Sequence, residues 1–271
     1  MNALEFRRSL EERKTLFGTL VVSTSPAWVP AVAGLGLDFV FVDTEHVPID
    51  RETLSWMCRA YECAGLAPLV RITSHDPYEA SAVLDGGASA VLVPYIETAA
   101  QIRDMVGAVK CKPVKGQLLD GVLAGDSVCA AQSAYASESN ASRSLLINIE
   151  SVPAMEHLDE LLAVEGIDGI IIGPHDLSVS LGVPEQWRHP RFVEAVETIL
   201  GAARDRGISA GIHMIYDEAL DQYEQWRDAG ANLILHLADL MAFRFCLRRE
   251  VAAIRQIMGV ESESEGDDIH I

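Results

Sequence analysis

The feature that most constrains the fold is the alternation of short apolar runs with amphipathic helical patterns. Eight apolar runs predict strands at 16–22, 38–43, 68–72, 90–94, 144–150, 169–173, 209–214 and 232–237. Each run is almost continuously apolar, as expected of parallel strands that are buried on both faces. Helical periodicity predicts helices at 26–36, 51–64, 76–86, 98–110, 151–164, 190–206, 217–229 and 239–258. Eight such units predict an α/β fold, a (β/α)8 TIM barrel in a single domain.

The alternative fold is an open doubly wound sheet, which often carries a GxGxxG turn. The stretch "GLGLDF" contains only GxG and leads into a strand. We expect the barrel to occupy 1–258, with an irregular insert at 111–144 that covers the active site; a disordered surface insert is the alternative. The acidic tail 259–271 is expected to be disordered.

Composition limits the partners of this chain. A net charge of −19 over 271 residues repels phosphate backbones and argues against nucleic-acid binding. No run of 18 apolar uncharged residues predicts a membrane span, and the charged N-terminus lacks the apolar core of a signal peptide. The five cysteines form no CxxC pair, which favours a reducing compartment. We therefore expect a cytoplasmic protein with small-molecule partners, no nucleic acid and no membrane.

Polar side chains gather where the predicted strands end. The C-terminal ends of barrel strands carry catalytic groups, and a polar ring at one rim is hard to explain by stability. A histidine there can still be structural, and an arginine can simply pair with a rim carboxylate. The residues at this rim are Asp43, Thr44, Glu45, His46, Arg71, Asn148, Glu150, His175, Asp176, His213 and His236.

The acidic pair Glu150 and Asp176 ends neighbouring strands, which lie about 5 Å apart in a sheet. Two unpaired carboxylates so close would repel, and a divalent cation removes the conflict. Oxygen ligands favour Mg²⁺ or Mn²⁺. The alternative is that both are helix caps, with Glu150 before the helix at Ser151 and Asp176 before the turn "DLSVS".

A metal at this place suits aldol chemistry. A 2-oxo acid that chelates the ion through its carboxylate and keto oxygen would lose a proton at the next carbon to give a metal-stabilised enolate. The competing route needs a Schiff-base lysine. None of the lysines ends a predicted strand: Lys14, Lys110, Lys112 and Lys115.

Four stretches together resemble one known family: "DFVFVDTEHVPID", "PLVRI", "VLDGGASAVLVP" and "INIESVPAMEHLDELLAVEGIDGIIIGPHDLSVSLG". They are similar to the HpcH/HpaI aldolase/citrate lyase family, most of all to its class II metal-dependent 2-keto-3-deoxy-acid (pyruvate) aldolases. The likeness covers roughly residues 15–240. It implies a barrel that binds Mg²⁺, Mn²⁺ or Co²⁺ on Glu150 and Asp176.

The resemblance also implies roles for single residues. Arg71 would steady the carbonyl oxygen and the developing alkoxide. His46 would be the acid/base, and Asp85 in "VLDGG" would keep it basic, unless Asp85 merely ends its helix. Substrate contacts would fall at Asn148, at the backbone of Pro174 and His175, and near His213. A homo-oligomer, trimer or hexamer, is implied, with 239–258 packed on a neighbouring subunit.

Four departures from the family pattern surround the expected pocket and leave substrate choice open. Asn148 stands where glutamine is usual, His175 where alanine is usual, and Leu20 where some members have tryptophan. The usual glycine-rich loop reads "QLLDGVLAGDS".

We expect this chain to cleave a 4-hydroxy-2-oxo acid to pyruvate and an aldehyde. One alternative is a carbon–carbon lyase or synthase of the same family that acts on a CoA ester or an oxaloacetate-like acid; the scarcity of lysines argues against CoA. The non-enzymatic alternative is a catalytically silent barrel that serves as an assembly partner. The aldehyde, the stereochemistry and the role of His236 stay open.

Overall fold

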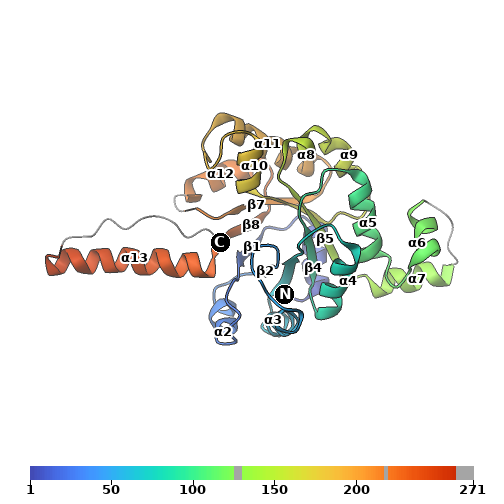
Figure 1. Ribbon diagram of the computed structural model, residues 1–271, viewed down its shortest axis with the longest axis horizontal. Helices are drawn as coiled ribbons and strands as arrows, with labels where there is room; N and C mark the ends of the chain where they lie inside the picture. Colours follow the sequence, from blue (N-terminus) through green and yellow to red (C-terminus); the bar gives the residue numbers. More distant parts are fainter. Residues whose placement is uncertain (125–129, 217–218, 261–271) are drawn as a thin grey trace.

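The computed structural model describes residues 1–124, 130–216 and 219–260. Its eight strands run parallel and close into a barrel in sequence order, because β1 pairs with both β2 and β8 (Figure 1). The strands are β1 (Leu16–Leu20), β2 (Phe39–Asp43), β3 (Ala67–Arg71), β4 (Ala90–Val93), β5 (Ser144–Ile149), β6 (Gly169–Ile172), β7 (Ser209–Met214) and β8 (Leu233–Ala238). The closed barrel confirms the predicted fold and rules out the open sheet.

The predicted helices form the layer outside the barrel, and local capping explains several of their starts. Asp50 and Asp76 accept backbone N–H groups at the starts of α3 and α4, and Thr98 forms a capping box with Gln101 at α5. The single helix expected at 151–164 is two short helices that meet at His157. The outer helices are α2 (Trp28–Ala33), α3 (Arg51–Cys63), α4 (Pro77–Gly86), α5 (Ala99–Lys110), α8 (Val152–Glu156), α9 (Leu158–Leu162), α10 (Pro174–Ser180), α11 (Pro190–Asp205), the 3₁₀ turn η1 (Ala219–Gln222) and α12 (Tyr223–Ala229).

The strands separate two apolar cores. One core fills the barrel, and the other lies between the strands and the outer helices. Phe39, Phe41 and Leu146 belong to the inner core, and side chains alternate along a strand. Asp43 and Glu150 continue the inward series of β2 and β5, so the same alternation brings both carboxylates to the mouth of the barrel.

The helix α1 (Ala3–Glu11), which the sequence patterns did not predict, closes the other end of the barrel. Its Phe6 and Leu10 are 0 % exposed and belong to the inner core. The Leu10 carbonyl accepts a hydrogen bond from the Ser209 hydroxyl at 2.7 Å, and Arg13 donates to the Gly230 carbonyl at 2.7 Å. These partners lie at the starts of β7 and β8, so α1 covers the N-terminal ends of the strands and leaves the C-terminal ends open.

The connection 111–144 contains two helices, α6 (Gly116–Leu123) and α7 (Ala130–Ser139), with 125–129 outside the described residues. It joins the end of α5 to the start of β5, and Arg7 of α1 donates to the Asn140 carbonyl at 3.1 Å. The insert therefore leaves the barrel at its closed end (Figure 1). The expectation of an irregular cover over the active site is wrong within one chain, because a helix-to-strand connection lies opposite the C-terminal rim.

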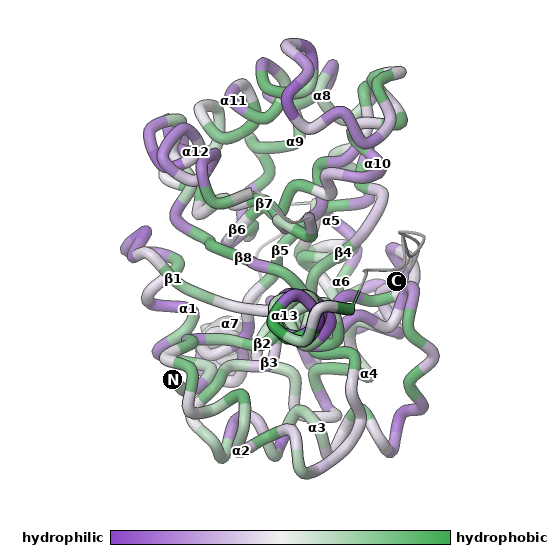
Figure 2. The backbone as a smooth tube through the Cα atoms, turned by 90° about the vertical axis from the view of Figure 1, so that its left-hand side faces the viewer, coloured by the Kyte–Doolittle hydropathy of each residue, from purple (hydrophilic) through white to green (hydrophobic). Residues whose placement is uncertain are grey.

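The last helix, α13 (Asp239–Met258), extends away from the barrel as an arm (Figure 1), and Figure 2 looks along it. Its first residue, Asp239, is buried and accepts the backbone N–H groups of Val22 and Ser23 at 3.0 and 2.9 Å. Farther along, large apolar side chains are 39–81 % exposed, among them Phe243, Leu247, Val251, Ile254 and Ile257. The arm thus carries an apolar face that is exposed among the described residues of the chain. The tail predicted to be disordered lies outside the described residues from 261 onward.

Among the described helices, none combines the length and the apolar character needed to cross a membrane.

Candidate active site

An arginine-centred ion pair lies at the ends of β2 and β3. Asp43 and Arg71 are direct partners in the strand register. Arg71 Nε donates to Asp43 Oδ1 at 2.9 Å, and Nη2 donates to Oδ2 at 2.6 Å, which is a two-point contact. Burial acts to raise the pKa of Asp43, but the hydrogen bonds and charge of Arg71, together with the hydrogen bonds from the Glu45 N–H and His46, outweigh it and lower that pKa below its ordinary value. The pair is therefore ionised and fixed in orientation.

His46 adjoins this pair through one ring nitrogen. Its Nδ1 lies 3.0 Å from Asp43 Oδ2 and 2.7 Å from Arg71 Nη2. Both contacts use Nδ1, so Nε2 is left for a substrate, and the side chain is 43 % exposed. A histidine held at one nitrogen and open at the other has the arrangement of a general acid/base.

Glu45 adds a second acidic group beside Arg71, with Oε2 at 3.1 Å from Arg71 Nε. Burial raises the pKa of Glu45 above its ordinary value. The charges of Arg71 and His46 oppose this effect, and the charges of Asp43 and Asp176 add to it. Ligand atoms of Asp43, Glu45 and His46 lie within 4.8 Å of one another, close enough to surround a metal. Arg71 already engages both the Asp43 and the Glu45 carboxylates, however, so an ion at this position would have to displace those contacts.

Glu150 is, with Asp43, a buried carboxylate of the rim. It is 3 % exposed, and its Oε1 accepts the Tyr95 backbone N–H at 2.8 Å. Its Oε2 is buried and has no hydrogen-bond partner among the described residues. Burial raises the pKa of Glu150 to about 7, and the charge of Asp176 adds to the effect. A buried anion with one unsatisfied oxygen, facing a second anion, is suited to a cation.

The "GPHD" stretch places Asp176 opposite Glu150. A side chain at Gly173 would collide with Glu150 Oε2, so only glycine leaves room for that carboxylate. Pro174 then starts α10 at the position where its missing N–H costs nothing, and Asp176 follows in the first turn. The apolar strand β6 ends at Ile172, before Gly173 and Pro174. The first turn of α10 follows and brings Asp176 to the same rim as Glu150.

The structure does not support the capping alternative for the acidic pair. The N-cap of α8 is Ser151, whose hydroxyl accepts the Ala154 N–H, whereas Glu150 binds Tyr95. The N-cap of α10 is Gly173, and Asp176 lies inside the helix. Neither carboxylate is a helix cap, and the two are close enough for the charge of Asp176 to raise the pKa of Glu150.

The expected substrate contacts lie at different depths. Asn148 is buried below Glu150, donates to the Ile171 carbonyl at 2.9 Å, and has an unpartnered Oδ1 among the described residues. His213 donates from Nε2 to the Leu237 carbonyl at 3.0 Å and packs edge-on against Phe41, and burial lowers its pKa to about 4. His213 is therefore neutral. The roles predicted for both residues in substrate binding stay predictions.

Besides Asp176, the first turn of α10 contains side-chain contacts that fix the backbone of Pro174 and His175. Pro174 is buried, and the half-exposed His175 ring approaches Glu185 with 3.4 Å between Nδ1 and Oε1. The buried Ser178 hydroxyl donates to the His175 carbonyl at 2.7 Å and accepts the Glu185 N–H at 3.0 Å. This first turn is thus held rigidly, which suits the backbone contacts predicted for Pro174 and His175.

Asp85 is not the carboxylate partner of His46 within the chain. It is 64 % exposed and contacts Lys112 at 2.5 Å and Arg143 at 3.9 Å. Asp85 ends α4, and helix ends in this fold lie at the closed end of the barrel, opposite the rim that carries His46. Within one chain the carboxylate beside His46 is Asp43, and the role that the resemblance implies for Asp85 stays a prediction.

Sequence reasoning missed the roles of Asp43, Glu45 and Tyr95. Asp43 was recognisable from the alternation of β2, since Phe39, Phe41 and Asp43 share one face. Glu45 carried no comparable signal, because its position depends on the turn after β2. Tyr95 acts on Glu150 through its backbone, which no side-chain pattern reveals.

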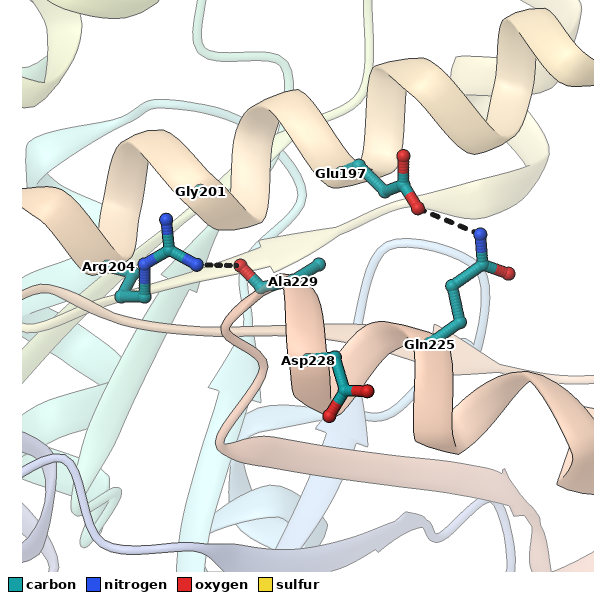
Figure 3. Close-up of a pocket in the computed structure, with 6 residues that line it drawn as sticks. All are labelled: Glu197, Gly201, Arg204, Gln225, Asp228 and Ala229. Atoms are coloured by element: carbon teal, nitrogen blue, oxygen red, sulfur yellow. Dashed lines mark hydrogen bonds between the residues drawn. The ribbon is translucent and has the colours of Figure 1, made fainter.

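Two other features lie apart from this cluster. His236, whose role was open, accepts or donates a hydrogen bond at Nδ1 with the Tyr223 hydroxyl at 2.9 Å. A hollow of about 400 Å³ lies between α11 and α12, where Gln225 donates to Glu197 at 2.8 Å and Arg204 to the Ala229 carbonyl at 3.2 Å (Figure 3). The charged Arg204 and Asp228 of this hollow pair with Asp205 and Arg227, which lie outside its lining. Both helices end there before the next strand begins, so the hollow is not part of the rim.

The fold and this rim define an enzyme class: a (β/α)8 barrel with an acidic, arginine-backed site at the C-terminal ends of its strands. The sequence model of the HpcH/HpaI aldolase/citrate lyase family matches residues 16–243, and the chain belongs to that family. The predicted resemblance and the prediction of an aldolase-family enzyme are therefore confirmed.

Named relatives and solved structures agree with this assignment. A 2-keto-3-deoxy-L-rhamnonate aldolase from Salmonella gallinarum is 31 % identical over 265 residues, which cover 97 % of this chain and 98 % of the relative. The crystal structure of an HpcH/HpaI aldolase from Desulfitobacterium hafniense has a TM-score of 0.80 at 28 % identity and covers 94 % of this chain and 98 % of that one. The crystal structure of a citrate synthase has a TM-score of 0.78 at 27 % identity, with 94 % and 99 % covered.

Proposed function

We propose that this chain is a divalent-metal-dependent class II aldolase that cleaves a 4-hydroxy-2-oxo acid to pyruvate and an aldehyde. The observation that carries the proposal is the buried Glu150 carboxylate, whose Oε2 is unpartnered among the described residues and whose pKa is raised by burial and by the charge of Asp176. Names of relatives, such as the 2-keto-3-deoxy-L-rhamnonate aldolase, support the same substrate class.

Glu150 and Asp176 are the residues that would hold the ion, Mg²⁺, Mn²⁺ or Co²⁺, because hard cations prefer oxygen ligands. Glu150 fits the role because burial and Asp176 disfavour its charged form without a cation. When bound, the ion supplies positive charge beside the keto oxygen of a 2-oxo acid, which favours proton loss at the neighbouring carbon.

Arg71 would bind the same end of the substrate. Asp43 and Glu45 engage its Nε and Nη2, and no hydrogen bond to a described residue uses Nη1. A guanidinium anchored on two sides can present its remaining N–H groups in a fixed direction. Arg71 therefore steadies the developing negative oxygen without having to reorganise.

His46 would move the proton. In cleavage, the C4 hydroxyl of the substrate loses its proton as the bond between C3 and C4 breaks and the aldehyde forms. Nε2 of His46 is the open nitrogen beside Arg71, and Nδ1 is held by Asp43 and Arg71. In the tautomer that makes Nε2 the base, Nδ1–H donates to the Asp43 carboxylate. The same Nε2 returns a proton to the C3 position, directly or through water, which yields pyruvate.

The experiment that tests this function follows exchange of the pyruvate methyl protons with D₂O by NMR, because it requires no knowledge of the aldehyde. We expect exchange with Mg²⁺ or Mn²⁺, loss of exchange with EDTA, and recovery when the metal is returned. Glu150→Gln should exchange slowly at the same metal concentration. Exchange that is unaffected by EDTA would contradict metal dependence, and a complete lack of exchange would favour the silent assembly barrel.

A second function within the family is condensation or cleavage of an oxaloacetate-like acid, which the similarity to a citrate synthase structure supports. Such an acid presents the same 2-oxo carboxylate to the rim. The two candidates are separated by incubating the enzyme with pyruvate and aldehydes, or with oxaloacetate and a second 2-oxo acid, and comparing kcat/KM for product formation.

The exposed apolar face of α13 favours assembly into a homo-oligomer, a trimer or a hexamer, in which the arm packs on a neighbouring subunit. An apolar surface of this kind on a projecting helix costs free energy in water and is stabilised when it is covered.

A further inference from the structure

Tyr95 holds an unusual position directly after β4, between the strand that carries Arg71 and the strand that leads to Glu150. Its backbone N–H donates to Glu150 Oε1 at 2.8 Å. Its φ angle is +51°, in the left-handed region that favours glycine. A tyrosine in this conformation costs on the order of 1 kcal/mol more than glycine would.

The hydrogen bond to Glu150 uses only the backbone of Tyr95, so a glycine would supply the same N–H without strain. The phenol is therefore not needed to hold Glu150. It is also not needed for the core, because Tyr95 is 49 % exposed. A side chain that is strained and half in solvent at the mouth of a barrel is a candidate for contact with a ligand.

Tyr95 follows β4 at the C-terminal rim, with Arg71 at the end of the neighbouring β3 and Glu150 after the neighbouring β5. Its backbone N–H contact with Glu150 and its half-exposed side chain place the residue beside the carboxylates of the site. Burial raises the pKa of Tyr95, and the charges of Asp176, Glu45 and Glu150 raise it further, against the effect of Arg71. A phenol beside these carboxylates keeps its proton, so it can donate a hydrogen bond.

We propose that the Tyr95 hydroxyl is a specificity-determining group that donates a hydrogen bond to an oxygen on the aldehyde-derived part of the substrate. This inference rests on the proposed aldolase function. The 2-oxo acid end is occupied by Glu150, Asp176 and Arg71, so the half-exposed hydroxyl is left for the distal end. The enzyme therefore prefers aldehydes that carry a hydroxyl next to the carbonyl over unsubstituted aldehydes.

The test compares lactaldehyde with propanal as acceptors for pyruvate, because the two differ by one hydroxyl group. For Tyr95→Phe we expect kcat/KM with lactaldehyde to fall about tenfold, mainly through KM, since one hydrogen bond is lost. With propanal, kcat/KM should stay within about twofold of the wild type. Metal-dependent exchange of pyruvate protons should be unchanged. Tyr78→Phe, at an exposed tyrosine on α4, is the matched control.

Tyr95→Gly provides a second variant, because it removes the hydroxyl, keeps the N–H and relieves the φ strain. It should lose the preference for lactaldehyde as Tyr95→Phe does. An equal loss for both aldehydes, or no loss for either, with pyruvate exchange intact, would overturn this inference and leave the aldolase proposal standing. A wild-type protein without pyruvate exchange would overturn both.

Discussion

At the residue scale, the chemistry depends on how Asp43 holds Arg71. The two-point contact fixes the plane of the guanidinium, and Phe41 packs beneath it with 5.5 Å between the guanidinium carbon and the ring centre. A charged group that is fixed before the substrate arrives stabilises a developing oxyanion more effectively than a mobile one.

Arg71→Lys should therefore be a poor enzyme even though it conserves the charge. An ammonium group cannot bind both oxygens of Asp43 and still present a fixed N–H to the substrate, so kcat should fall roughly 100-fold. Steady-state kinetics of aldol cleavage measure this. Arg204→Lys, in the hollow between α11 and α12, is the matched control and should retain full activity. Near-normal turnover of Arg71→Lys would remove Arg71 from the mechanism.

His46→Ala should lower kcat by roughly 10²–10⁴, the usual contribution of a positioned acid/base. The loss should appear in aldol cleavage, measured by release of pyruvate, while metal affinity stays close to that of the wild type because His46 is not one of the proposed ligands. A variant that cleaves at the wild-type rate would assign the proton transfer to another group.

Glu150 makes the stability of the metal-free protein depend on pH. Its pKa is raised from 4.5 to about 7 in the folded protein, so the folded state binds the proton more tightly than the unfolded state. The resulting stabilisation is complete below about pH 4.5 and is lost as pH rises through about 7. A shift of this size corresponds to roughly 3 kcal/mol at most.

Denaturant unfolding of EDTA-treated protein between pH 5 and pH 8 should therefore show a falling free energy of unfolding in the wild type and a smaller fall in Glu150→Gln. The difference between the two proteins isolates Glu150 from other titrating groups such as His213. Added Mg²⁺ should restore the wild type at pH 8 and have little effect on the variant. If the free energy of unfolding falls equally with pH in both proteins, the pKa of Glu150 is not raised in the folded state.

At the element scale, α13 is the part whose shape one chain does not explain. Asp239 ties its start to the loop after β1, and the rest carries an exposed apolar face. Deleting 240–271 should yield monomer or aggregate in sedimentation velocity experiments. A control that ends at residue 260 keeps the whole helix and should assemble as the full chain does. If the protein that lacks 240–271 keeps the native assembly, α13 is not the contact between subunits.

The apolar stripe of α13 was predictable from the spacing of Phe243, Leu247, Val251 and Ile254. In the single chain that stripe is exposed, which is compatible with the expected packing on a neighbouring subunit. The pattern of α1 misled instead. Its charged residues hide the two side chains, Phe6 and Leu10, that fill the closed end of the barrel.

At the scale of the whole molecule, the barrel was predictable because each strand is a continuous apolar run and each helix has its own periodicity. The site was predictable wherever position along the chain determines position in space, as for Arg71, Glu150 and Asp176 at the strand ends. Contacts that depend on the end of the barrel at which a loop lies were not predictable from the sequence. Asp85 and the insert 111–144 both belong to the closed end, which sequence adjacency to a motif does not reveal.

The central claim is that Glu150 and Asp176 together form a site for one divalent ion. Isothermal titration calorimetry with Mn²⁺ tests it most directly, with the wild type, Glu150→Gln and Asp176→Ala after EDTA treatment and dialysis. We predict one site per chain in the wild type and a loss of affinity of at least about 100-fold in each variant, because the remaining carboxylate has to hold a strongly hydrated ion almost alone. Wild-type affinity in both folded variants would contradict the account and leave this rim without its metal.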